Sequence, residues 1–168
     1  MADLIVADAS PLIVLARAGH LEILALVAGK VIVPDVVIRE CADDLERPGA
    51  RVIEQAFATG WLSRQPQSPR LESVNAAGLG PGEAAAIGLA LALRSPLLID
   101  ERIGRQVAAA HALKVIGTIG ILLLAKQRSL ITAIKPVIDT FKREGIFIAP
   151  ALELEILQRA GESANQAH

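Results

Sequence analysis

The 168-residue chain contains few residues of several kinds, and each shortage excludes a class of protein. It has no tyrosine, three phenylalanines and one tryptophan, which excludes a surface that stacks successive bases on aromatic rings. Its one cysteine, Cys41, excludes an internal disulfide framework and a cysteine-rich metal site. Lysine and arginine number 17 against 18 acidic residues, which excludes a polybasic tail, an acidic tail and a disordered polyelectrolyte.

Long hydrophobic runs are also missing. The longest uncharged apolar run, 115–125, has 11 residues and includes two glycines, whereas a membrane-spanning helix needs about 20 apolar residues. The first residues are acidic where a secretory signal is basic. We therefore expect a cytoplasmic protein that does not associate with a membrane.

The chain is rich in alanine, leucine, isoleucine and valine, and 52% of it is hydrophobic. This composition is typical of a parallel sheet that helices bury on both faces. Short β-branched runs alternate with longer helical patterns, which predicts an α/β fold with three α/β/α layers around a central, mostly parallel sheet. The predicted strands are 4–7, 31–33, 61–63, 97–99 and 114–116.

Helix signals lie between the predicted strands. Ser10 is expected to cap the first helix, with Pro11 at its first position and Gly19 as its stop signal. The loop Gly78–Gly82 is expected to open a helix that runs to about Arg94. The other predicted helices are about 20–28, 35–42, 50–58, 101–112, 119–128, 136–144 and 150–160.

The chain is expected to form a single domain over residues 1–161. Within it, about 135–161 form a C-terminal helical extension, 64–77 form a polar loop, and 162–168 form a disordered tail. The helices at 20–28 and 119–125 are the most apolar and are candidates for a dimer interface, although periodicity alone does not separate an interface from a core.

Acidic residues occur where a parallel sheet binds its ligands, beyond the carboxyl ends of the strands. Asp8 ends the first predicted strand, while Asp100 and Glu101 follow the fourth. Glu83 lies in the first turn of the helix after the glycine-rich loop, and Glu40 lies about one and a half turns into its helix. We expect Asp8 and Asp100 to share one edge of the sheet, which Glu40 and Glu83 could reach from neighbouring helices.

Each acid also has an ordinary structural interpretation. Glu83 fits a carboxylate at a helix N-terminus, Glu40 a solvated side chain, Asp8 an Asx turn, and Asp100 with Glu101 a helix cap. Together, however, they would repel one another in a cleft, and a divalent cation relieves that repulsion. Hard oxygen ligands favour Mg²⁺ or Mn²⁺, which support phosphoryl chemistry by activating water and neutralising charge on the leaving oxygen.

Four segments resemble the motifs of PIN domains, the nuclease fold of the VapC-type toxins. Their order is that of the family, and the resemblance covers about residues 3–160. A further segment, KVIGTIGILLLAK at 114–126, is similar to a branch of PIN-like proteins of unassigned function. The four segments are DASPLIVL at 8–15, VPDVVIRE at 33–40, GPGEAAAI at 80–87 and LIDERIGR at 98–105.

The resemblance implies an endoribonuclease that depends on Mg²⁺ or Mn²⁺. Asp8, Glu40, Glu83 and Asp100 match the family's acidic catalytic and metal-binding quartet, and Ser10 matches its small hydroxyl position, a substrate contact. Toxins carry a Thr-x-Asp-x-x-Phe segment where this chain has LIDERI. The fourth metal ligand is therefore Asp100, Glu101 or both. The resemblance also implies a homodimer and a small antitoxin protein as partner.

An RNA substrate needs cations near the acids. Arg102 and Arg105 follow Asp100 directly, and arginine suits bidentate contact with phosphate. Pairing with Glu101, or simple solvation of a helix, explains these arginines equally well.

Two other functions remain open at the level of sequence. One is a PIN-like module that does not cleave and instead binds a protein partner or RNA, with its acids serving as structural caps. The other is a small-molecule phosphatase on a related α/β fold. Saturable Mn²⁺ binding that requires Asp8 and Asp100 would distinguish the nuclease from the binding module.

Overall fold

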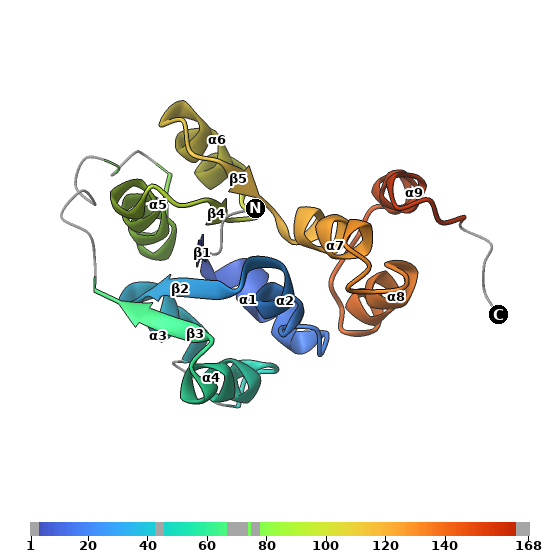
Figure 1. Ribbon diagram of the computed structural model, residues 1–168, viewed down its shortest axis with the longest axis horizontal. Helices are drawn as coiled ribbons and strands as arrows, with labels where there is room; N and C mark the ends of the chain where they lie inside the picture. The colour runs from blue at the N-terminus through green and yellow to red at the C-terminus, as the bar shows by residue number, and fades with distance from the viewer. Residues whose placement is uncertain (1–3, 43–45, 67–73, 75–77, 164–168) are drawn as a thin grey trace.

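The structure is a computed structural model that describes residues 4–42, 46–66, 74 and 78–163. Five strands form one sheet in the order β3-β2-β1-β4-β5, and all neighbouring strands are parallel (Figure 1). The strands are β1 (Leu4–Ala7), β2 (Lys30–Pro34), β3 (Leu62–Gln65), β4 (Leu97–Leu98) and β5 (Val115–Ile116).

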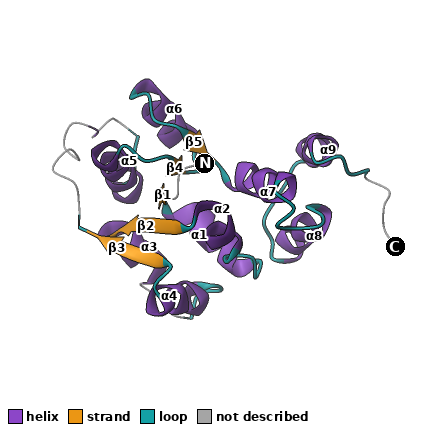
Figure 2. Cartoon of the chain, in the orientation of Figure 1, coloured by secondary structure: helices purple, strands orange, loops and turns teal. Residues whose placement is uncertain are grey.

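Helices connect the strands and lie on both faces of the sheet (Figure 2). Parallel strands require such crossover connections, so the observed topology confirms the predicted three-layer α/β/α fold. Two further helices, α8 and α9, follow α7 as a C-terminal helical extension. The helices are α1 (Ala9–Arg17), α2 (Ile23–Ala28), α3 (Asp35–Ala42), α4 (Ala50–Thr59), α5 (Pro81–Leu93), α6 (Arg102–Ala110), α7 (Thr118–Gln127), α8 (Lys135–Arg143) and α9 (Pro150–Arg159).

The central strand β1 sets the position of the first predicted acid. Its residues Ile5, Val6 and Ala7 have no exposed surface, as expected for a parallel strand covered on both faces. Val6 pairs with β2 on one side and with β4 on the other. The backbone N–H of Asp8 then donates to the carbonyl of Leu98 at 2.9 Å, which joins the carboxyl ends of β1 and β4.

The prediction that Ser10 caps the first helix is wrong. Helix α1 begins at Ala9, and Asp8 occupies the N-cap position with an extended backbone (φ −83°, ψ 169°) and no side-chain cap. The chain leaves β1 at Ala7, so Asp8 is the one residue available to turn from strand to helix. Pro11 is the third residue of the helix and not the first, as predicted, but it still lies in the first turn, where a missing N–H costs no helical hydrogen bond.

Other element boundaries shift by a few residues. The predicted helix at 20–28 forms only from Ile23, and the predicted strand at 61–63 becomes Leu62–Gln65. The start of the predicted polar loop at 64–77 therefore belongs to a strand, while its residues 67–73 and 75–77 lie outside the described part of the chain. Residues 164–168 of the predicted tail also lie outside it.

The two most apolar helices contact each other inside the molecule. Helix α2 packs against α7, and Val27 of α2 and Leu122 of α7 are both buried. Leu26 remains 55% exposed. The packing thus accounts for much of the apolar surface that suggested a dimer interface, and the homodimer stays a prediction. Among the described residues, no helix combines the length and the apolar character needed to cross a membrane.

Candidate active site

A pocket of about 390 Å³ opens where β1 ends, at the carboxyl edge of the sheet. Carboxylates from three different elements face it: Asp8 after β1, Glu40 on α3 and Glu83 on α5. A fourth, Glu101, comes from the residue before α6. The remaining lining residues are Ala9, Ser10, Gly78, Gly80 and Gly82.

Asp8 is the buried member of this group, with 2% of its surface exposed. Among the described residues, its Oδ1 atom has no hydrogen-bond partner. Burial raises the pKa of Asp8 to about 6, while a hydrogen bond from the backbone of Ala9 opposes that shift. The negative charges of Glu83, Glu40 and Asp100 raise the pKa further. A buried carboxylate with one oxygen that lacks a partner favours a cation.

Glu40 is held in the pocket by the glycine-rich loop. The backbone N–H of Gly82 donates to Glu40 Oε1 at 3.0 Å, across the contact between α3 and α5. A Cβ atom at position 82 would lie only 2.3–2.6 Å from the carboxyl atoms of Glu40. The close approach of α5 to this carboxylate therefore requires glycine.

Glu83 stands at the third position of α5 and turns back over the start of the helix. Its Oε2 atom accepts a hydrogen bond from the backbone N–H of Gly80 at 3.0 Å. The structural role that the sequence suggested for Glu83, a carboxylate favoured by the helix dipole, is therefore present. Glu83 lines the pocket at the same time, so the two interpretations are compatible.

Asp100 and Glu101 are adjacent in sequence but lie differently. Glu101 lines the pocket. Asp100 is exposed and bonds to the start of α7: its Oδ1 accepts from the backbone N–H of Thr118 at 2.7 Å, and its Oδ2 accepts from the Thr118 hydroxyl at 2.6 Å. The Asp100 charge still acts on Asp8 from beside the pocket.

The two predicted arginines occupy different places on α6. Both are exposed, and Arg102 is not among the residues that line the pocket. Arg105 lies next to Asp100: a Cβ added at Gly117 would meet Arg105 Nη1 at 2.6 Å and Asp100 Oδ1 at 2.9 Å. The structure therefore brings Arg105 to the edge of the acidic group.

The donor atoms at the pocket suit a hard divalent cation. They are carboxylate oxygens, the ligands that Mg²⁺ and Mn²⁺ prefer. As the side chains lie, no three His, Cys, Asp or Glu residues in the described ranges are grouped closely enough to hold a metal ion. The unpaired Oδ1 of Asp8 is the atom of this chain that fits a metal best. Cys41 does not fit, because burial and the charges of Asp8 and Glu40 raise the pKa of its thiol to about 12.

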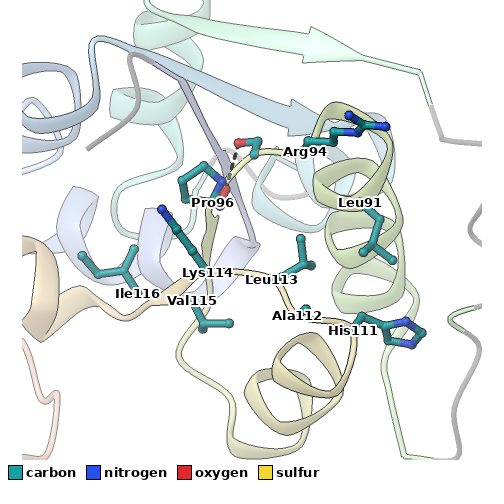
Figure 3. Close-up of a pocket in the computed structure, with 10 residues that line it drawn as sticks. Leu91, Arg94, Pro96, His111, Ala112, Leu113, Lys114, Val115 and Ile116 are labelled. Atoms are coloured by element: carbon teal, nitrogen blue, oxygen red, sulfur yellow. Dashed lines mark hydrogen bonds between the residues drawn. The ribbon is translucent and has the colours of Figure 1, made fainter.

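Another pocket, of about 620 Å³, opens at the opposite edge of the sheet (Figure 3). It lies before β4 and β5 and is mainly apolar, with Leu91, Leu113 and Val115 in its lining. No acidic residue of the described ranges lines it. This pocket therefore lacks the groups for metal-assisted hydrolysis, although it is larger than the acidic one.

Sequence reasoning missed two contacts that arrange the acids. Gly82 belongs to the predicted loop Gly78–Gly82, and nothing in the local sequence indicates that its N–H meets Glu40, 42 residues earlier. Thr118 is 18 residues from Asp100. The sequence signal for this contact is that Thr118 begins helix α7 soon after β5, the strand next to β4 in the sheet.

The fold and the pocket define an α/β protein with an acidic site at the carboxyl edge of a parallel sheet. A family model described as a PIN domain matches residues 4–162, and the chain belongs to the PIN-domain family. PIN domains are generally nucleases and typically use divalent metals. No curated protein and no solved structure gives a significant match.

Proposed function

We propose that this PIN domain is an endoribonuclease of the VapC type that hydrolyses RNA phosphodiester bonds with Mg²⁺ or Mn²⁺. The observation that supports this most strongly is the buried, unpaired Oδ1 of Asp8 in a pocket that Glu40 and Glu83 also line. Such a group of carboxylates repels itself when no cation is bound. Burial of Asp8, together with the neighbouring negative charges, raises the pKa of Asp8.

Asp8 would hold the metal through Oδ1, while Glu40 and Glu83, which the N–H groups of Gly82 and Gly80 orient, would supply further carboxylate ligands from the pocket wall. Glu101 would contribute from the pocket wall, and Asp100 from beside it. When bound, the metal would activate water and neutralise charge on the leaving oxygen.

Substrate contacts come from the polar groups around the acids. Ser10 is exposed at the pocket and offers a hydroxyl donor to a phosphate oxygen. Arg105, beside Asp100, and Arg102, one turn earlier on α6, offer guanidinium groups to the flanking phosphates. The oxygen of water adds to the scissile phosphorus, the bond between phosphorus and the 3′ oxygen breaks, and a proton from the water passes to the 3′ oxygen, which leaves a 5′-phosphate and a 3′-hydroxyl.

We extend the proposal to the setting in which such a nuclease works. The protein acts as the toxin of a toxin–antitoxin pair in the cytoplasm, forms a homodimer and is neutralised by a small antitoxin protein. The resemblance of the four motif segments to VapC-type toxins supports this setting.

A second candidate function is a PIN-like module that binds a protein partner or RNA without cleaving it. The hydrogen bonds from Gly80 to Glu83 and from Gly82 to Glu40 favour this function, because they give two of the acids structural roles. The absence of a ready-made three-ligand group in the described residues favours it as well.

Calorimetric titration with Mn²⁺, with RNA cleavage assayed on the same samples, decides between these two functions. We expect saturable Mn²⁺ binding and cleavage by the wild type, and loss of both in Asp8→Asn/Asp100→Asn. Glu54→Gln, an exposed change on α4 at a residue that does not line the pocket, is the control and should behave like the wild type. A well-folded wild type that neither binds Mn²⁺ nor cleaves RNA would overturn the nuclease proposal and favour the binding module.

A further inference from the structure

Asp100 is held at two points by a single residue. The backbone N–H of Thr118 donates to Oδ1 at 2.7 Å, and the Thr118 hydroxyl donates to Oδ2 at 2.6 Å. Both distances lie within the normal range for hydrogen bonds. Thr118 itself is 3% exposed, so its side chain is fixed by packing while Asp100 is open to solvent.

The local backbone makes room for this contact. Helix α7 begins at Thr118, where its first N–H groups have no partner within the helix and attract negative charge. Gly117 precedes it in an extended conformation (φ −101°, ψ 176°). A Cβ at Gly117 would stand 2.9 Å from Asp100 Oδ1 and 2.6 Å from Arg105 Nη1, so glycine leaves space for both groups.

We propose that Thr118 is a positioning residue of the acidic site. Its two donors fix the orientation of the Asp100 carboxylate just after β4, beside the end of β1, where the backbone N–H of Asp8 donates to the carbonyl of Leu98 at 2.9 Å. This inference rests on the proposed metal-dependent function. It adds to that function a residue outside the acidic quartet that sets how tightly the acids bind their metal.

The hydroxyl is the decisive donor. With the hydroxyl removed, the backbone N–H remains and Asp100 is held at one oxygen only, so the exposed carboxylate is free to rotate. Groups that orient metal-binding carboxylates typically change metal affinity by about 10–100-fold when removed. A helix-capping role alone has a different consequence, because loss of a cap lowers stability without altering metal affinity.

The test compares Thr118→Val, which removes the hydroxyl at nearly constant shape, with Thr118→Ser, which keeps both donors. Mn²⁺ alone is titrated by calorimetry at a temperature well below the Tm of each variant. We expect Thr118→Val to weaken Mn²⁺ binding by about 10–100-fold, and Thr118→Ser to restore it. The control is Thr59→Val, which removes an exposed hydroxyl at the end of α4 that bonds only to helix carbonyls.

The outcomes separate this inference from the function on which it rests. If the wild type binds Mn²⁺ and Thr118→Val binds it equally tightly, Thr118 is only a helix cap and the positioning role is overturned. If the wild type itself binds no Mn²⁺, the nuclease proposal fails and the inference fails with it.

A second variant covers the case in which Thr118→Val does not fold. Gly117→Ala keeps the hydroxyl but places a methyl group against the held carboxylate. Because that carboxylate must move, we expect weaker Mn²⁺ binding here as well. Unchanged affinity in Gly117→Ala would overturn the positioning role.

Discussion

At the scale of single residues, the carboxylates of the site differ in how many hydrogen-bond partners they have. Glu83 accepts a hydrogen bond from the backbone N–H of Gly80, and Asp100 accepts two hydrogen bonds from Thr118. Asp8, the most buried of them, keeps one oxygen without a partner in the described structure. The free-energy cost of placing several carboxylates close together therefore falls mainly on Asp8. A cation bound next to Asp8 would offset the largest part of that cost.

That cost makes stability depend on pH in a defined direction. In the unfolded chain Asp8 ionises near pH 3.8, whereas burial and the neighbouring acids hold its folded pKa at about 6. Between these values the folded state keeps a proton that the unfolded state has lost, so this group lowers stability as pH rises from 4 to 6. At pH 7 the ionised side chain destabilises the fold by an amount on the order of 3 kcal/mol.

We therefore predict that Asp8→Asn, which carries no titratable group, raises Tm relative to the wild type more at pH 7 than at pH 4. Thermal denaturation of both proteins without added metal, at several pH values, measures this difference. The same comparison for Glu54→Gln should show no such trend, because Glu54 is exposed. A difference in Tm between Asp8→Asn and the wild type that does not vary with pH would contradict the prediction.

At the scale of elements, the start of α5 arranges two acids at once. Gly80 and Gly82 donate to Glu83 and Glu40 respectively, so one short loop orients carboxylates from two helices. Pro81 stands at the first helical position, where its missing N–H is not needed and its fixed φ favours the turn into the helix. The loop therefore determines the shape of the pocket as well as the start of the helix.

This arrangement predicts an unusual effect of a glycine-to-alanine change. Within a helix, such a change normally stabilises by about 0.5–1 kcal/mol. In Gly82→Ala the new Cβ would lie 2.3–2.6 Å from the Glu40 carboxyl group, so we expect displacement of Glu40, no gain in Tm and at least tenfold weaker Mn²⁺ binding. Calorimetry and thermal denaturation measure these effects.

Gly80→Ala is the matched change in the same loop. Its Cβ would lie 3.9 Å from Glu83 Oε2, an ordinary contact distance, so this variant should fold without displacing a carboxylate. A Gly82→Ala variant that is more stable than the wild type and binds Mn²⁺ normally would show that Glu40 does not depend on the loop.

The same elements show how far sequence reasoning reaches. Apolar runs and helix signals predicted the order of strands and helices, and the strand-end rule placed Asp8 and Asp100 at one edge of the sheet. The prediction that Ser10 caps the first helix is wrong, because the chain turns from strand to helix at the single residue Asp8, which leaves no place for a later cap. The contacts of Gly82 and Thr118 depend on helices packed from distant parts of the chain, which no local pattern encodes.

At the scale of the whole molecule, the two edges of the sheet differ in chemistry. The carboxyl edge gathers acids around a small pocket, while the opposite edge carries the larger apolar pocket of Figure 3. The net charge is −1, so the chain as a whole offers no attraction to RNA. Affinity for RNA must then come from local cationic side chains such as Arg105 and from a bound divalent cation that neutralises the acids.

Metal binding should consequently stabilise the whole fold, since it relieves repulsion among groups that only the folded chain brings together. A ligand at about 100 times its dissociation constant adds about 2.7 kcal/mol to the free energy of unfolding, which raises Tm by roughly 5–10 °C for a chain of this length. We predict such a shift for the wild type with Mn²⁺ at pH 7, its reversal by a chelator, and its loss in Asp8→Asn/Asp100→Asn. Glu54→Gln should retain the full shift. Equal Mn²⁺ effects in the wild type and the double variant would place the metal elsewhere, and no effect in either would favour the binding module over the nuclease.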